Sequence, residues 1–328
     1  MSDLSEERTD GRLYAELVED LVFSHPLLSL YLDPEFGEKP DLPPVKIMQA
    51  AYLVCLLQNW EGDDIAKKRI RQHRFTTLLS IARDIGFSSM NHNIRSLDPV
   101  SWESFVEREQ AIRTFTYIFL LDSAFLIFNN TPPKIMLQEL EVELTCSEDI
   151  FQAETSEACQ ALWQLSSINV ATQDNFTLAS AIEAFTRSAI NPITNLPSRL
   201  STLNLFAIIS GFHTILFQHR TLFAYPLTSL EQIRLAIERW KVVWEQRAEN
   251  NPTILYHTSK SWQRVGFIGH ADEYAALALA QLDNLETQRA SGAPKLGNPG
   301  VQASLERLDD TSMSQITNLM LNLAVATD

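Results

Sequence analysis

The chain has 328 residues, 45% of them hydrophobic, and its 26 basic and 41 acidic side chains give a formal net charge of −15. A surface of that charge repels nucleic acid and anionic membranes, so neither is an expected partner of this chain alone. The three cysteines, Cys55, Cys146 and Cys159, lack metal-finger spacing and fit buried thiols in a reducing compartment.

The N-terminal 24 residues form a polar, acidic leader and a first helix. The leader lacks the basic flank and apolar centre of a secretory signal, so we expect an intracellular protein in the nucleus or cytoplasm. Leu13 to Phe23 has the spacing of an amphipathic helix, which the sequence predicts to stop at His25-Pro26. Asp33 to Pro44 holds four prolines and is predicted to be a loop.

Three helices are predicted in the next third of the chain. Pro43-Pro44 precede an apolar run that ends near Trp60, and Asp63 or Asp64 can cap a helix from Ile65 to Ile85 that closes at Gly86. Asp98-Pro99 begin a long helix that ends at the Asn-Asn-Thr-Pro-Pro run after Phe128. Its apolar half is interrupted by Asp122 and is shorter than the roughly 20 residues of a membrane span, so no membrane span is expected.

The second half of the chain is also predicted to be helical. Two helices are expected between Glu148 and Ser188, with a turn at Asn169 to Asp174, and a core helix follows at Leu203 to His219. Ser229 and Gln232 can form a capping box for the next helix. Glu273 to Leu285 is the last predicted helix of the main body.

These segments predict an all-α protein in which short, proline-marked connections join the helices of one large domain. That domain is expected at residues 25–287, after the leader and first helix at 1–24. The segment 288–300 is rich in small residues and predicts a linker, and 301–328 contains a C-terminal helix between Met313 and Val325.

Several stretches of the sequence resemble the middle homology region of fungus-specific transcription factors. The long helix has the pattern of an acidic-basic pair, Arg108-Glu109 with Arg113, then an aromatic run, Asp122 and a proline-bearing turn. The combination also includes four other segments, which read RQHRFTTLLSIARDIGF (71–87), LTCSEDIFQA (144–153), RWKVVW (239–244) and VGFIGHADEY (265–274). Together they are similar to the branch whose members carry zinc fingers of the two-cysteine, two-histidine type.

This resemblance implies a helical regulatory domain that restrains or licenses an attached activator and in some members responds to small molecules. It implies no catalytic residue. Two features depart from the family pattern: Thr145 stands where the family often has proline, and no Cys-x-x-Cys pair of a zinc finger is present. We therefore expect no nucleic-acid binding by this chain alone, and contacts with the transcription machinery or other proteins instead.

Charged residues offer two candidate sites. One stretch is crowded with basic residues: Lys67, Lys68, Arg69, Arg71 and Arg74. A solvated helix face, or arginines that reach inward, explains this cluster better than a phosphate-binding patch does. Glu109 and Arg113 lie four residues apart on one helix face, and Asp122 lies in an apolar run. The three are predicted to form a structural charge network, with Asp122 held by an arginine such as Arg113 or by helix-end amides.

Aromatic residues concentrate between Phe206 and Tyr274, and a pocket between packed helices is predicted there. The predicted ligand-binding residues are Phe206, His213, Trp240, Tyr256 and Arg264. If the chain is instead an enzyme, a cyclase or isomerase of secondary metabolism without metal, its candidate catalytic residues are His213, Tyr256, His257 and Glu273. The histidines lack metal-ligand spacing, and no phosphate-binding, dinucleotide or nucleophile-elbow motif is present, so no metal or cofactor is expected.

The sequence thus favours a regulatory domain that acts through protein contacts and a small apolar ligand. The enzyme is the alternative, in which the inter-helical cavity orients a substrate. A homodimer formed through apolar positions of the final helix is a third interpretation; these positions are Met313, Ile316, Leu319, Met320 and Leu323.

Overall fold

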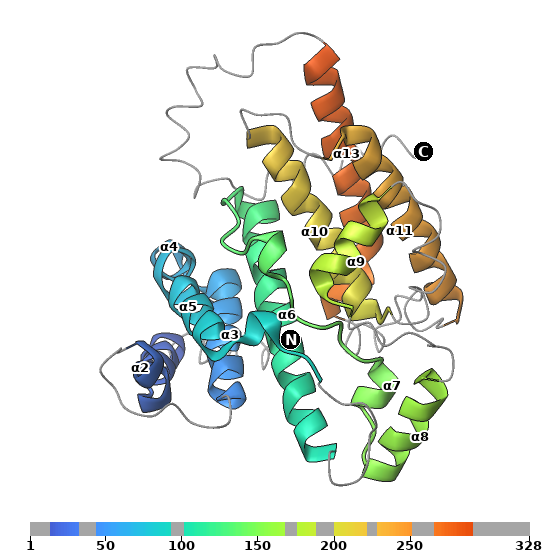
Figure 1. Cartoon of the computed structure of the whole chain (residues 1–328). Coiled ribbons are helices and arrows are strands. Elements are labelled where there is room, and N and C mark those ends of the chain that lie inside the picture. The colour runs from blue at the N-terminus through green and yellow to red at the C-terminus, as the bar shows by residue number, and fades with distance from the viewer. Residues whose placement is uncertain are drawn as a thin grey trace, which may run out of the picture.

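Helices account for almost all the regular structure of the chain. The computed structural model describes residues 14–32, 44–92, 102–167, 176–187, 200–221, 228–250 and 266–290. Within these ranges the only β pairing is an isolated bridge between Glu143 and Thr177, so the prediction of an all-α fold is confirmed. Figure 1 shows α6 in the middle, with α2 to α5 on one side and α9, α10, α11 and α13 on the other.

The N-terminal helices differ from the prediction at one point. Residues 14–23 are helical and this helix stops before His25-Pro26 as expected, but the chain then forms a second helix, α2 (Pro26–Leu32), that was not predicted. Pro26 is the first residue of α2, a position where its missing N–H has no helical partner to lose. Proline therefore separates two helices here and does not begin a loop.

The next helices follow the predicted ranges closely. Helix α3 (Val45–Glu61) begins directly after Pro44, and the Asp63 carboxylate caps α4 (Asp64–Arg69) by accepting the N–H of Ala66 at 2.7 Å. A single π-helical turn (Ile70–Arg74) joins α4 to α5 (Phe75–Ile85). Gly86 ends α5 with a φ of 83°, a left-handed conformation that favours glycine.

Helix α6 (Trp102–Asn129) is the central element of the core. It contacts α3 on one side and α10 (Thr202–Thr221) on the other. It is long and apolar enough to cross a membrane by length and composition, but 78% of its most apolar window is buried inside the protein. That burial is typical of the core helix of a folded domain. Asn130 follows with a φ of 53° and ends the helix at the predicted Asn-Asn-Thr-Pro-Pro run.

Three shorter helices follow α6. These are α7 (Glu148–Phe151), α8 (Ser156–Ser167) and α9 (Leu178–Thr186), where two helices were predicted between Glu148 and Ser188. The predicted turn at Asn169 to Asp174 lies outside the described residues. Helix α9 packs against α10 at Gly211, where a Cβ atom would lie only 2.7 Å from Cδ1 of Ile182. Glycine at this position therefore allows the two helices to approach closely.

The C-terminal helices pack around α10. Helix α11 (Leu230–Asn250) begins with the predicted capping box, in which Ser229 N donates to Gln232 Oε1 at 2.8 Å and Gln232 N donates to Ser229 Oγ at 3.1 Å. Both α11 and α13 (Ala271–Ala290) contact α10. The linker was predicted at 288–300, but α13 continues to Ala290, so its first three residues are helical. The rest of that segment and the predicted C-terminal helix lie outside the described residues.

Candidate functional site

The predicted site residues fall into three places along α6. Glu109 and Arg113 lie in its first half, Asp122 lies in its second half, and His213 lies beside a cavity at its C-terminal end. Each place has different partners and a different degree of access to solvent.

The first place is a buried network of charges. Arg113 Nε donates to Glu109 Oε1 at 2.6 Å, and Glu109 Oε2 lies 2.6 Å from Nε2 of His92. The other ring nitrogen of His92 is 3.0 Å from Glu143 Oε2, and Arg113 also reaches Glu148 at 3.1 Å. Sequence reasoning missed His92, since 17 residues separate it from Glu109 and nothing in the spacing links the two.

Opposite charges in this network shift one another's pKa values. Burial alone would lower the pKa of His92, but hydrogen bonds to Glu109 and Glu143 and their charges raise it to about 9. Burial alone would raise the pKa of Glu109, and His92 and Arg113 nevertheless hold it below its usual range. At neutral pH His92 therefore carries a positive charge between two carboxylates.

The same network also ties loops and aromatic side chains to α6. Arg113 donates to the carbonyl of Cys146 at 2.9 Å and lies over the ring of Phe151, with 3.9 Å between Cζ and the ring centroid. The His92 ring stacks on Phe105 with centroids 5.3 Å apart. Glu109 is 0% and His92 4% exposed, so the charges hold the fold together and offer no access to a substrate.

Asp122 has neither Arg113 nor Glu109 as a partner. One carboxylate oxygen, Oδ2, accepts the backbone N–H groups of Lys134 and Ile135, each at 2.8 Å. Burial raises the pKa of this carboxyl to about 6, although the hydrogen bonds from the two backbone N–H groups lower it. The structure therefore places Asp122 apart from the Glu109–Arg113 pair, as an acceptor for the loop that follows α6.

The basic cluster at 67–74 faces inward in large part. Arg69 and Arg74 both donate through Nε to the buried carboxylate of Glu19, each at 2.8 Å, and Arg71 donates to Asn59 at 3.2 Å. The π-helical turn places Arg69 and Arg74, five residues apart, on the same side. The arginines of this cluster are therefore occupied by internal partners.

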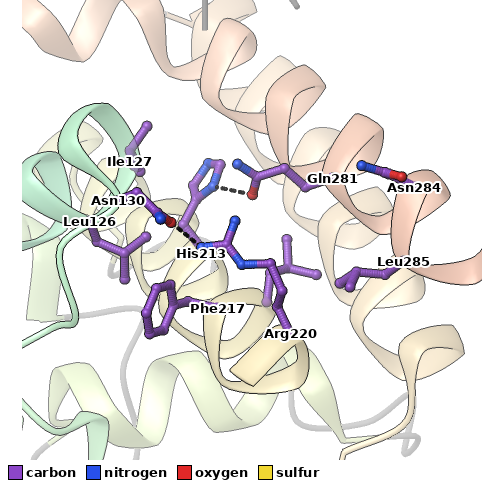
Figure 2. Close-up of a pocket in the computed structure, with 10 residues that line it drawn as sticks. Leu126, Ile127, Asn130, His213, Phe217, Arg220, Gln281, Asn284 and Leu285 are labelled. Carbon is purple, nitrogen blue, oxygen red and sulfur yellow. Dashed lines mark hydrogen bonds between the residues drawn. The ribbon is translucent and has the colours of Figure 1, made fainter. Parts of the chain in front are cut away.

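The third place is a cavity between the end of α6, α10 and α13, shown in Figure 2. Its volume is about 90 Å³, and it is open to solvent on one side. Half of the lining side chains are apolar: Leu126, Ile127, Leu216, Phe217 and Leu285. The other half are polar or charged, without any carboxylate: Asn130, His213, Arg220, Gln281 and Asn284.

His213 is held by two partners at the edge of this cavity. Nε2 lies 3.0 Å from the Tyr274 carbonyl, and Nδ1 lies 3.2 Å from the Gln281 amide group. Burial lowers the pKa of His213 to about 4, so the ring is neutral at pH 7 and has one N–H. The atom of Gln281 that faces Nδ1 is Oε1. Since a neutral ring that donates from Nε2 to the carbonyl can only accept at Nδ1, the Gln281 amide must turn its NH₂ group to Nδ1 for this bond to form. Both ring nitrogens are then in use within the protein.

The remaining predicted residues do not gather at one site among the described residues. Phe206 packs edge-on against Tyr274, and Trp240 stacks on Trp244 and donates to the Leu205 carbonyl at 2.8 Å, so these two rings belong to the core. Glu273 bonds His270 near the surface. Tyr256, His257 and Arg264 lie outside the described residues. Arg220, which the prediction did not include, lines the cavity.

Among the described residues, no group of three or more His, Cys, Asp and Glu side chains is placed to hold a metal ion.

Comparison with known proteins gives one clear likeness. The chain is 33% identical over 336 aligned positions to "Transcription factor verF" of Penicillium polonicum. The alignment covers 96% of this chain and 46% of that protein, so the chain spans about half the length of the relative it matches. No protein-family model matches the chain, and no solved structure matches it. The chain is thus a relative of a fungal transcription factor.

Proposed function

We propose that the chain is the regulatory domain of a fungal transcription system, acting in the nucleus through protein contacts and through a small, largely apolar ligand. The observation that carries this proposal is the likeness to a fungal transcription factor along 96% of the chain. The sequence lacks the cysteine pairs of a zinc finger, so DNA binding in this proposal belongs to another segment or another chain.

The charges of the described residues support regulation without direct DNA contact. A protein that binds duplex DNA usually neutralises several phosphates with lysine and arginine. Here Arg69 and Arg74 are bonded to Glu19, and the chain as a whole carries −15. Electrophoretic mobility shifts with duplex DNA at physiological salt test this part, and tight binding of the chain by itself would contradict it.

Exposed apolar side chains support the protein contacts. Tyr14, Leu17, Val18 and Leu21 lie at helical spacing on the first helix and are 43% to 70% exposed. A second copy of the chain is the partner proposed for this stripe, with the opposite face of the helix already buried through Glu19 and Phe23. Sedimentation of the chain and of a Leu17→Glu, Leu21→Glu variant tests it, because only the unsubstituted chain is expected to dimerise.

The cavity between α6, α10 and α13 supports a ligand. Its lining combines apolar walls with a few polar groups, which is the usual composition of small-molecule sites. With about 90 Å³ it is smaller than the ~300 to 1,000 Å³ of sites that enclose drug-sized molecules. The proposed ligand is accordingly small, or extends in part through the open side.

Fusion of the chain to an unrelated DNA-binding domain tests the regulatory function. Transcription of a reporter with the matching DNA site is expected to change when the chain is attached, and to change again when a metabolite extract of the host is supplied. A second fusion with Glu109→Ala, which disrupts the buried network, controls for the need of a folded domain. A reporter that ignores the attached chain in every condition would contradict the proposal.

The enzyme alternative, a cyclase or isomerase, has less support from the described residues. His213 uses both ring nitrogens internally, and Glu273 bonds His270 away from the cavity lining. Mass spectrometry of an extract incubated with the chain separates the two functions. A regulatory ligand raises the melting temperature and is recovered unchanged, whereas a substrate is converted.

A further inference from the structure

Among the described residues, Arg220 has no acidic partner beside the cavity. Its NH₂ group donates to the side-chain oxygen of Asn130, and its Cζ atom lies 5.1 Å from the centroid of the Phe217 ring. Among the described residues no Asp or Glu lies within ion-pair distance of it. An arginine without a carboxylate is notable in a chain with 41 acidic residues.

The guanidinium is reachable, although protein atoms crowd it. Arg220 is an exposed residue near the C-terminal end of α10, and desolvation by its surroundings lowers the pKa of its guanidinium. Figure 2 shows the side chain extending toward Asn130 among the lining residues. A guanidinium has five N–H donors in a planar fork, so the bond to neutral Asn130 leaves donors for another acceptor.

The walls of the cavity restrict the kind of ligand that can carry this acceptor. Four apolar side chains present hydrocarbon surface to the cavity: Leu126, Leu216, Phe217 and Leu285. Contact with this surface stabilises a bound apolar group and does not stabilise an inorganic ion. A cavity of about 90 Å³ admits only a short chain or part of a ring. Arginine binds carboxylates through two parallel hydrogen bonds, and no lining acid competes for it.

We infer that the cavity between α6, α10 and α13 binds a small apolar carboxylic acid as its anion, with the carboxylate paired to Arg220 and the hydrocarbon part against Leu216 and Phe217. This inference rests on the proposed function and names the chemical class of its ligand. The anion supplies the negative charge that the described residues do not place at Arg220, and the apolar tail supplies contact area that a free anion lacks.

Isothermal titration of the full chain with hexanoate and with hexanamide tests the inference. The two probes have the same length and differ in charge, so hexanoate is expected to bind at least tenfold more tightly, a factor worth about 1.4 kcal/mol. Arg220→Met should abolish that preference, and Arg220→Lys should retain part of it since lysine keeps the charge and loses the fork. Arg187→Met, at an exposed arginine paired with Glu183, should leave binding unchanged.

Four results would overturn the inference. These are equal affinity for hexanoate and hexanamide, equal affinity for hexanoate and inorganic phosphate, an Arg220→Met variant that binds as the unsubstituted chain does, and absence of hexanoate binding at about 10 mM. Circular dichroism of Arg220→Met establishes that the variant is folded before its binding is judged.

The reporter fusion separates this inference from the proposed function. If hexanoate binds through Arg220 but the reporter ignores the attached chain, the site stands and the regulatory function fails. If the reporter responds to the extract equally with and without Arg220→Met, regulation stands and the carboxylate site fails.

Discussion

Arg113 lies in the first half of α6 and Arg220 lies beside the C-terminal end of that helix, and their partners differ. Arg113 is bonded to Glu109, Glu148 and a backbone carbonyl inside the protein, whereas Arg220 has an asparagine and an open cavity. A buried charge with all its partners contributes to holding helices and loops together. A reachable charge without an acidic partner contributes little to the fold and remains available to a ligand. Arginine is thus structural in the first half of α6 and suited to recognition beside the C-terminal end of that helix.

The largest loss of stability is expected from substitution of Glu109. Glu109→Ala leaves Arg113 and His92 as buried cations without their shared carboxylate, and should lower the free energy of unfolding by about 3 to 5 kcal/mol. Urea denaturation followed by circular dichroism measures the loss. Glu183→Ala, in the exposed pair with Arg187, is the matched control and should cost no more than about 0.5 kcal/mol. Similar losses in both variants would mean that the buried pair stabilises the fold no more than the exposed pair does.

Asp122 should have the next largest effect. Asp122→Ala leaves the amides of Lys134 and Ile135 without an acceptor, at a cost of about 2 to 3 kcal/mol. Asp122→Asn keeps an oxygen for both amides and should be distinctly milder. Thermal and urea unfolding of the two variants decide the matter. An asparagine variant as unstable as the alanine variant would mean that the charge, and not the acceptor, is what the loop requires.

His92 should make the free energy of unfolding fall as the pH rises above neutral. The pKa of His92 is raised from its ordinary value of 6.5 to about 9 in the folded chain by Glu109 and Glu143, against the effect of burial, with Arg113 bonded to the same Glu109. A raised pKa stabilises the fold fully below pH 6.5, and this contribution is lost as pH rises through 9. The loss should be on the order of 2 kcal/mol between pH 6.5 and 9.5.

His92→Gln tests the origin of that dependence, because glutamine does not titrate. The variant should be less stable near neutral pH, and its free energy of unfolding should vary less between pH 6.5 and 9.5 than that of the unsubstituted chain. Equal slopes in the two proteins would assign the pH dependence to other groups.

The smallest effect on stability is expected at Arg220. Arg220→Met removes a charge that has no acidic partner among the described residues, so the free energy of unfolding should change by no more than about 0.5 kcal/mol. The same substitution at Arg113 should cost several times as much, since it leaves Glu109 and Glu148 without their cation. Chemical denaturation of the two variants side by side is the most direct test of the comparison.

The sequence predicted the helices well where local signals decide. Asp63 as a cap, Gly86 as a left-handed terminus and the Ser229–Gln232 box all depend on residues within one turn, and each was found as expected. The π-helical turn at Ile70–Arg74 was missed because it changes register inside one continuous helical pattern. Helix α2 was missed because the proline that ends one helix is equally suited to begin the next.

The site was less accessible to sequence reasoning because its contacts join distant segments. Glu109 and Arg113 share a helix face, so their pairing could be predicted, but His92 reaches them from a loop and Glu148 from the start of α7. Aromatic density led to Phe206 and Trp240, whose rings fill the core. No local sequence pattern marks Arg220, because it is distinguished only by having no acidic neighbour in space among the described residues.

The central position of α6 has a consequence for the order of synthesis. Helix α3 precedes α6 and can cover one of its sides early, but α10, which covers another, begins about 70 residues after α6 ends. At about 5 to 20 residues per second, a ribosome takes roughly 4 to 14 s to make that stretch. During this interval α6, a helix long and apolar enough to cross a membrane, is without its later partner. Chaperone binding to the growing chain should therefore be strongest between the emergence of α6 and that of α10.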